Sequence, residues 1–178
     1  MLMCTDRVRR RLEVVAATDP LTGLFNRRSF GDTAADRFNK AKVAGKGFML
    51  VLLDVDRFKA VNDTYGHEVG DKVLMHVAGR LQNVARDDDM IARLGGEEFV
   101  MLLETDDWEG GMGAAERIRQ AVADQAIRVD LQDIVVTVSG GVARFDPEDH
   151  SLSDVLRRAD QALYLAKSAG RNRVAARA

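Results

Sequence analysis

The sequence is poor in several features that define whole classes of protein. Its 178 residues include a single cysteine, Cys4, so no disulfide forms within the chain and no cysteine-rich zinc site can be built. The longest apolar run, residues 48–53, is far shorter than the roughly 20 residues of a membrane-spanning helix. The formal net charge of -2 gives no overall attraction to nucleic acid. We therefore expect a cytoplasmic protein with neither a membrane span nor a nucleic-acid partner, in which local cations hold any anionic ligand.

What the sequence does contain is typical of one globular α/β (α+β) domain. Hydrophobic residues make up 46% of the chain and charged residues 30%, as in ordinary globular proteins. Apolar residues recur at helical spacing in five segments, which we expect to be helices: residues 5–17, 27–44, 68–86, 109–126 and 153–169. Apolar or alternating runs predict strands at residues 48–55, 90–94, 99–103 and 134–142. Strands separated by helices, with one internal hairpin, favour a mixed sheet with helices on its faces.

A boundary near residue 18 divides the chain into two parts. Pro20 biases Asp19 away from the helical conformation, so the first helix should end close to Thr18. We expect residues 1–18 to form a linker helix and residues 19–178 to form the folded domain.

The segment between the two central apolar runs sets two glycines beside two carboxylates. Gly95 and Gly96 permit backbone conformations that are closed to other residues and let a ligand approach the backbone closely. Glu97 and Glu98 follow directly, and the next apolar run begins at once. The pattern predicts a strand, a tight turn and a second strand, with a tip suited to hold metal and phosphate.

A second polar cluster begins where the apolar strand of residues 48–55 ends. Asp54 directly follows three apolar residues, and strand ends in sheets covered by helices are common places for ligands. A carboxylate at this place can instead cap the helix that follows. The stretch by itself supports both interpretations.

Taken together, these segments resemble the GGDEF domain of diguanylate cyclases. The family's hallmark hairpin corresponds to residues 95–99, with Glu97 where the family accepts either acid. The opening signature corresponds to residues 19–28, the metal and guanine segment to residues 54–71, and the closing motif to residues 162–173. The resemblance implies a central mixed, mainly antiparallel sheet of about five strands flanked by helices, similar to nucleotide cyclases and the palm of polymerases.

The resemblance also implies an activity, the condensation of two GTP molecules into cyclic di-GMP with release of pyrophosphate. By the same resemblance Asp54, the Val55 carbonyl and Glu97 hold Mg²⁺, with Mn²⁺ as a substitute, and such oxygen ligands suit Mg²⁺. Glu98 is expected to bind a second metal or to help deprotonate the attacking 3′-hydroxyl. Glu97 is also a candidate for that proton, so the choice of base stays open.

Further residues match the family's contacts to the nucleotide. By resemblance, the phosphates are held by Lys59, Lys167 and Arg171, close to the glycines Gly95 and Gly96. The guanine is held, by the same resemblance, by Asn62 and Asp71. A carboxylate can accept the paired N–H donors of guanine, which adenine lacks. Without the motif, the three cations are ordinary solvated charges, and the asparagine and aspartate are ordinary capping or surface residues. Lys167 and Arg171 are four residues apart and share one helical face if the helix persists near Gly170.

An Arg-x-x-Asp pattern, Arg86 with Asp89, lies five residues before the hairpin glycines. Its spacing resembles the inhibitory site at which members of the family bind their product. An arginine can pair with phosphate or guanine acceptors, and an aspartate can accept guanine donors. Arg117, on the following predicted helix, is a third candidate. The alternative is a solvated charged loop.

One domain supplies one GTP, so two copies must meet, and we expect a homodimer with twofold symmetry. The segment before Asp19 resembles the end of a signalling linker, which implies an upstream sensor domain or partner. The competing hypothesis is a non-catalytic module that senses GTP or cyclic di-GMP and acts through a protein partner. Such modules typically have a broken hairpin motif, whereas residues 95–99 are intact.

Overall fold

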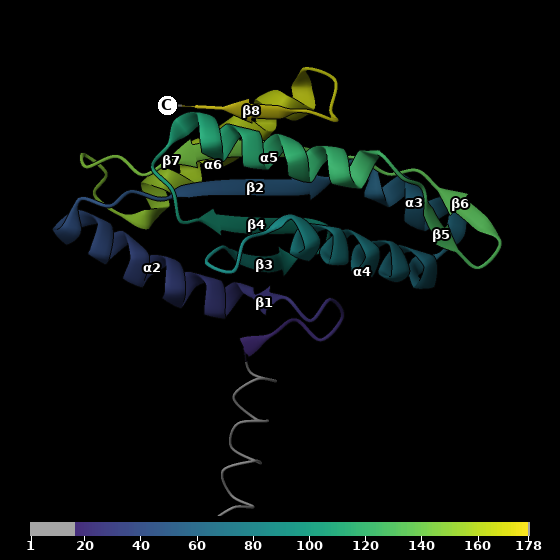
Figure 1. Ribbon diagram of the computed structural model, residues 1–178. Coiled ribbons are helices and arrows are strands. Elements are labelled where there is room, and N and C mark those ends of the chain that lie inside the picture. The colour runs from purple at the N-terminus through teal and green to yellow at the C-terminus, as the bar shows by residue number, and fades with distance from the viewer. Residues whose placement is uncertain (1–16, 178) are drawn as a thin grey trace, which may run out of the picture.

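The sheet is built around strand β2 (Met49–Val55), whose seven residues are all buried. The computed structural model describes residues 17–177, and β2 lies inside a six-stranded sheet of order β1-β3-β4-β2-β7-β8 (Figure 1). The other strands are β1 (Phe25–Asn26), β3 (Met90–Gly95), β4 (Glu98–Leu103), β7 (Val138–Arg144) and β8 (Val174–Ala176). The unbroken apolar run at the start of β2 explains its place, because helices cover both faces of this strand.

The strand pairings are mixed and mainly antiparallel. β2 pairs antiparallel with both β4 and β7, and β3 pairs antiparallel with β4. The two outer strands, β1 and β8, pair parallel with β3 and β7. The predicted fold class is therefore confirmed. The sheet has six strands rather than about five, because β1 and β8 are only two and three residues long and leave no periodic signal in the sequence.

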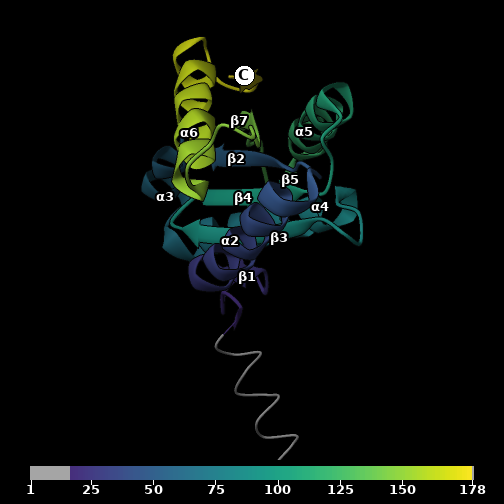
Figure 2. The same ribbon diagram turned by 90° about the vertical axis from the view of Figure 1, so that its left-hand side faces the viewer.

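Helices cover the sheet on both sides (Figures 1 and 2). Helices α2 (Arg27–Ala44) and α6 (Leu152–Ser168) pack on the face that carries Leu50 and Leu52. Helices α3 (Phe58–Tyr65), α4 (His67–Val84) and α5 (Trp108–Ala123) pack on the face that carries Met49, Val51 and Leu53. Alternate residues of β2 thus serve two separate apolar cores, as the pleat of a strand requires.

Most predicted elements are confirmed to within a few residues. The predicted helix 27–44 matches α2, which starts because the Asn26 side chain accepts a hydrogen bond from Ser29 N and ends at the left-handed Gly45. The helices predicted at 68–86, 109–126 and 153–169 correspond to α4, α5 and α6. The strands predicted at 48–55, 90–94 and 99–103 correspond to β2, β3 and β4.

The strand predicted over residues 134–142 is wrong as a single element. Its first residue ends β6 (Gln132–Ile134), which forms a separate hairpin with β5 (Ile127–Val129), and β7 begins only at Val138. Ile134, Val136 and Val138 are nevertheless all buried in one core. Alternation thus identified the buried face correctly, but it does not report which backbone partner each residue has.

Two further expectations concern the first predicted helix and a membrane span. The predicted helix of residues 5–17 lies, apart from residue 17, outside the described residues. None of the helices in residues 17–177 is both long and apolar enough to cross a membrane.

Substitution of a buried glycine tests the close contact between the sheet and α6. A Cβ atom on Gly141 of β7 would lie 2.1 Å from the Ala159 carbonyl oxygen and 2.3 Å from Leu163 N, both backbone atoms that a side-chain rotation cannot move. Gly141→Ala should therefore lower the free energy of unfolding by about 2 to 4 kcal/mol, measured by urea denaturation.

The matched control is Gly79→Ala within α4, where a Cβ has nothing within 4 Å. This change should raise the free energy of unfolding by about 0.5 to 1 kcal/mol, because alanine favours the helix. Equal effects of the two substitutions would contradict the close approach of α6 to β7.

Candidate active site

The β3–β4 turn brings the hairpin carboxylates to the end of β2. Gly95 and Gly96 have φ values of 139° and 53°, which favour glycine over any other residue. Glu98 pairs with Asp54 across the β4–β2 ladder, and Val55 N donates to the Glu97 carbonyl oxygen at 3.2 Å. The tip of the hairpin therefore lies against the end of β2, as the family resemblance implied.

Arg93, which sequence reasoning missed, holds the hairpin turn. Its Nε and its second terminal nitrogen donate to the Gly96 carbonyl oxygen at 2.9 and 2.8 Å, and its other terminal nitrogen donates to Asp19 Oδ1 at 3.1 Å. Burial alone would raise the pKa of Asp19, but hydrogen bonds from Thr22 and Arg93 hold that pKa below its ordinary value. In the sequence, this role is indicated only by a charged residue inside an otherwise apolar strand.

Asp54 is buried at the end of β2 and forms an ion pair with Lys167, whose Nζ lies 2.8 Å from Oδ2. Burial raises the pKa of the Asp54 carboxyl, Lys167 opposes this shift without cancelling it, and the negative charges of Glu97 and Glu98 add to it. Asp54 does not cap the next helix, because the N-cap of α3 is Arg57 and no side chain caps that end. The capping interpretation of Asp54 is therefore wrong.

The donor set at this junction fits a divalent cation that is completed by substrate. No group of three or more His, Cys, Asp or Glu side chains in residues 17–177 could hold a metal ion unaided. Mg²⁺ does not need such a cage, since it commonly takes one or two carboxylates together with waters and substrate phosphates. Asp54 is buried with a raised pKa and lies close to Glu97 and Glu98, so a bound cation would stabilise its ionised form.

The three candidate phosphate cations come from two helices and the loop after the second. Lys59 is exposed on α3, and Lys167 lies in the last turn of α6 against Asp54. The condition under which Lys167 and Arg171 would share a helical face is not met, because α6 ends at Ser168 and the chain then turns through Gly170 with φ 114° and Arg171 with φ 63°. The Arg171 side chain is exposed and has no hydrogen bond or ion pair within the described residues.

The two candidate guanine residues lie on successive helices. Asn62 is on α3 and Asp71 is exposed on α4, and neither side chain caps a helix. Within residues 17–177, Asn62 Oδ1 is buried without a hydrogen-bond partner, and a Cβ atom on Gly70 would lie 1.9 Å from it. A buried acceptor without a partner is costly unless a ligand supplies the donor.

The Arg86 to Asp89 segment forms a closed turn at the end of α4. Asp89 Oδ2 accepts from Arg86 N at 3.0 Å, and Asp89 N donates to the Arg86 carbonyl oxygen at 3.0 Å. Cavities of about 250 and 140 Å³ adjoin this turn, the first beside Gly23 and Leu24 and the second beside the start of α5. Arg117 is exposed on α5. The turn thus places the Arg86 guanidinium next to both cavities.

Asp56 is a second residue whose role sequence reasoning missed. It is buried, 7% exposed, and its carboxylate accepts hydrogen bonds from Thr137 Oγ1, Ser139 Oγ and Asn172 N at 2.6, 2.7 and 3.0 Å. The signal available in the sequence is the spacing of Asp54 and Asp56, which places both carboxylates on one face of an extended chain.

Comparisons with known proteins agree with this geometry. A family profile described as "Diguanylate cyclase, GGDEF domain" matches residues 16–173. The chain is 42% identical over 159 residues to the diguanylate cyclase DgcP of Pseudomonas aeruginosa, a match that covers 89% of this chain and 24% of DgcP. The chain thus spans about a quarter of the length of that relative.

Two solved structures are similar over nearly the whole chain. The coiled coil and GGDEF domain of DgcB from Caulobacter crescentus, in complex with c-di-GMP, has a TM-score of 0.90 and 36% identity, covering 99% of this chain and 95% of that one. The active GGEEF domain of a diguanylate cyclase from Vibrio cholerae has a TM-score of 0.80 and 37% identity, covering 85% and 96%. The sequence GGEEF is also that of residues 95–99 here.

The raised pKa of Asp54 predicts a stability effect with a definite sign. A carboxyl whose pKa is higher in the folded than in the unfolded state contributes stability below the unfolded pKa, and this contribution is lost as pH rises through the folded pKa. Asparagine resembles the neutral form at every pH. Asp54→Asn should therefore raise the free energy of unfolding of the metal-free domain at neutral pH, and the gain should shrink as the pH falls toward 3.8, the ordinary pKa of an aspartate.

Urea denaturation in the presence of a chelator, repeated across this pH range, measures the effect. Asp63→Asn, on the exposed face of α3, is the matched control and should change stability little. A less stable Asp54→Asn variant at neutral pH would show that the carboxylate is well accommodated, contrary to this account.

Proposed function

Because the chain belongs to the GGDEF family of diguanylate cyclases, we propose that it condenses two molecules of GTP into cyclic di-GMP and releases pyrophosphate. The observation that carries the proposal is the junction of β2 with the hairpin tip, where buried Asp54 lies close to Glu97, Glu98 and Lys167. This combination of carboxylates and a cation suits a nucleotide triphosphate with its metal better than it suits any neutral ligand.

The cofactor that we propose is Mg²⁺, with Mn²⁺ able to replace it. Asp54, the Val55 carbonyl and Glu97 would hold it, and the metal would neutralise phosphate charge and favour loss of a proton from the attacking hydroxyl. Glu98, which is exposed at the hairpin tip, can take a second cation or accept the 3′-hydroxyl proton, and Glu97 is the alternative base.

Binding of the triphosphate requires cations around it, because phosphoryl transfer depends on position and on neutralised charge. We propose that Lys59, Lys167 and Arg171 supply them, with the backbone of Gly95 and Gly96 close to the phosphates. Lys167 already touches Asp54, so an incoming phosphate would meet a charge that is held in place. The exposed Arg171 guanidinium is free to turn toward the phosphates.

We assign the guanine to Asn62 and Asp71. The unpaired Asn62 Oδ1 supports this assignment, since a guanine N–H would complete its hydrogen bonding. A purine without that donor would leave the acceptor buried and unpaired, which is the physical basis for preferring GTP over ATP.

Formation of a cyclic product from two nucleotides requires two active sites that face each other. We propose that two copies of the domain meet with twofold symmetry, so that each 3′-hydroxyl attacks the α-phosphate held by the other copy. Residues 1–18 would link this domain to an upstream sensor or partner. The matched Caulobacter structure likewise includes a coiled coil together with its GGDEF domain.

The product is also the inhibitor that we propose. Arg86, Asp89 and Arg117 would hold cyclic di-GMP beside the cavities at the end of α4. Cyclic di-GMP is present in the similar Caulobacter structure, which supports the ligand. The alternative function, a non-catalytic sensor of GTP or cyclic di-GMP, is not favoured, because the hairpin motif is intact and its glycines have the conformations that the motif requires.

The activity itself is the first test. Incubation with GTP and Mg²⁺ should give cyclic di-GMP and pyrophosphate, measured by chromatography, and Glu97→Ala should reduce the rate by about a hundredfold or more. Glu148→Ala, the same change at an exposed loop position, is the control and should keep the wild-type rate. Absence of product from folded wild-type protein at high concentration would overturn the proposed function.

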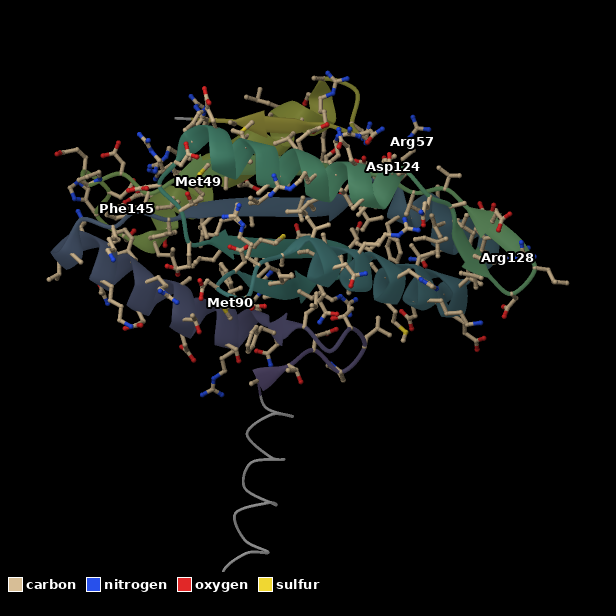
Figure 3. All side chains as sticks on the ribbon, in the orientation of Figure 1. Met49, Arg57, Met90, Asp124, Arg128 and Phe145 are labelled. Carbon is tan, nitrogen blue, oxygen red and sulfur yellow. The ribbon has the colours of Figure 1, made fainter. Side chains whose placement is uncertain are left out.

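Product inhibition is a separate test. Arg86→Ala should raise the cyclic di-GMP concentration for half-inhibition by about tenfold or more, each variant being compared with its own uninhibited rate, because a charged hydrogen-bond donor is lost. Arg128→Ala, on the β5–β6 hairpin at the far end of the molecule (Figure 3), should leave that concentration unchanged. Equal inhibition of the wild type, Arg86→Ala and Arg128→Ala would rule out the proposed inhibitory site.

A further inference from the structure

The loop after α6, residues 170–172, holds an unusual backbone conformation. Gly170, Arg171 and Asn172 have φ values of 114°, 63° and 47°, so two successive residues with side chains are in the left-handed region. Such residues are disfavoured and persist only where their surroundings hold them. Backbone hydrogen bonds at the end of α6 hold the first two residues, from Gly170 N to the Lys167 carbonyl oxygen at 3.3 Å and from Arg171 N to the Ala166 carbonyl oxygen at 3.1 Å, whereas Asn172 needs support from elsewhere.

Packing does not supply that support on the side facing α3. A cavity of about 420 Å³ lies between the loop, α3 and residues 134–137. Arg57, the residue after Asp56, is at this edge of the sheet (Figure 3). Since the loop borders open space there, hydrogen bonds rather than apolar contacts must define its position.

Two hydrogen bonds hold Asn172 in place. Its backbone N–H donates to Asp56 Oδ2 at 3.0 Å, and its side-chain Oδ1 accepts from the Arg119 guanidinium at 2.6 Å. Arg119 is itself fixed by an ion pair with Glu116 on the same helix. The bond to Asp56 is the one that ties the loop to the end of β2, two residues from Asp54.

Asp56 is well suited to act as this anchor. Its side chain is buried, and its remaining hydrogen bonds, to Thr137 and Ser139, fix the carboxylate against β7 and the segment before it. Charged acceptors form stronger hydrogen bonds than neutral ones. The carboxylate thus joins β2, β7 and the loop that carries Arg171.

We propose that Asp56 is a positioning residue that holds the 170–172 loop so that Arg171 is directed at the triphosphate. The proposal rests on the proposed function, in which Arg171 contacts phosphate. Asp56 touches neither substrate nor metal in this scheme and acts only through the loop. Loss of its carboxylate should therefore weaken nucleotide binding to the extent that Arg171 contributes to it.

The experiment measures the dissociation constant of a non-hydrolysable GTP analogue with Mg²⁺ by calorimetry, beside the rate of cyclic di-GMP formation. Asp56→Ala and Arg171→Ala should each weaken binding by about tenfold, and the double variant should bind within about twofold of Arg171→Ala alone. Asp56→Asn should bind the analogue much better than Asp56→Ala. Its amide oxygen can still accept from Asn172 N, while its amide nitrogen donates to Ser139 Oγ.

Ser139→Ala is the matched control. It removes a hydrogen bond from Oδ1 of Asp56 but leaves the bond between Oδ2 and Asn172, so analogue binding should stay within about twofold of wild type. If Asp56→Ala does not fold, Asn172→Pro at the exposed loop tests the same link, since proline has no backbone N–H to donate to Asp56 Oδ2. It should also weaken binding.

The outcomes are separable. Unchanged binding in Asp56→Ala, or in Asn172→Pro where the first does not fold, would overturn the positioning role. Independent, multiplying losses in the double variant would do the same, because Asp56 would then act through another route. A wild type that binds the analogue yet forms no cyclic di-GMP would overturn the proposed function while leaving the binding comparison intact.

Discussion

The antiparallel register of β2 and β4 is the constraint on which the site depends. It sets Asp54 opposite Glu98 and Leu53 opposite Phe99, and it lets Val55 N reach the Glu97 carbonyl. A slip of one residue would move every side chain of one strand to the other face of the sheet. The register is fixed by the apolar residues of both strands, which are buried in two cores, and so core packing places the carboxylates.

The same arrangement gathers negative charge that is electrostatically unfavourable without a cation. Three carboxylates lie at the junction, and Lys167 is the one cation that contacts Asp54 within the described residues. Burial raises the pKa of Asp54, which means that the ionised form is destabilised by its surroundings. A metal ion with its nucleotide would relieve this repulsion, so the domain is better adapted to the bound state than to the free one.

The sequence predicted the parts of the site that depend on local pattern. The hairpin glycines, the strand-end Asp54 and the limits of α2 follow from turn chemistry, apolar runs and capping residues, all of which act over a few residues. The single strand at 134–142 was wrong because alternation reports burial and not pairing. Lys167 and Arg171 do not share a helical face, because the helix on which this depended, α6, ends before Gly170. Asp56 was missed because its side-chain partners are 81 to 116 residues away in sequence, and the bond from Arg93 to Asp19 was missed because the two are 74 residues apart.

The central claim is that Asp54 at the end of β2 holds a divalent cation together with the nucleotide. The most direct measurement is Mn²⁺ binding in the presence of a non-hydrolysable GTP analogue, with free Mn²⁺ quantified by electron paramagnetic resonance. The account predicts saturable binding to the wild type that is lost in a folded Asp54→Asn variant. Equally tight Mn²⁺ binding by the two proteins would contradict it.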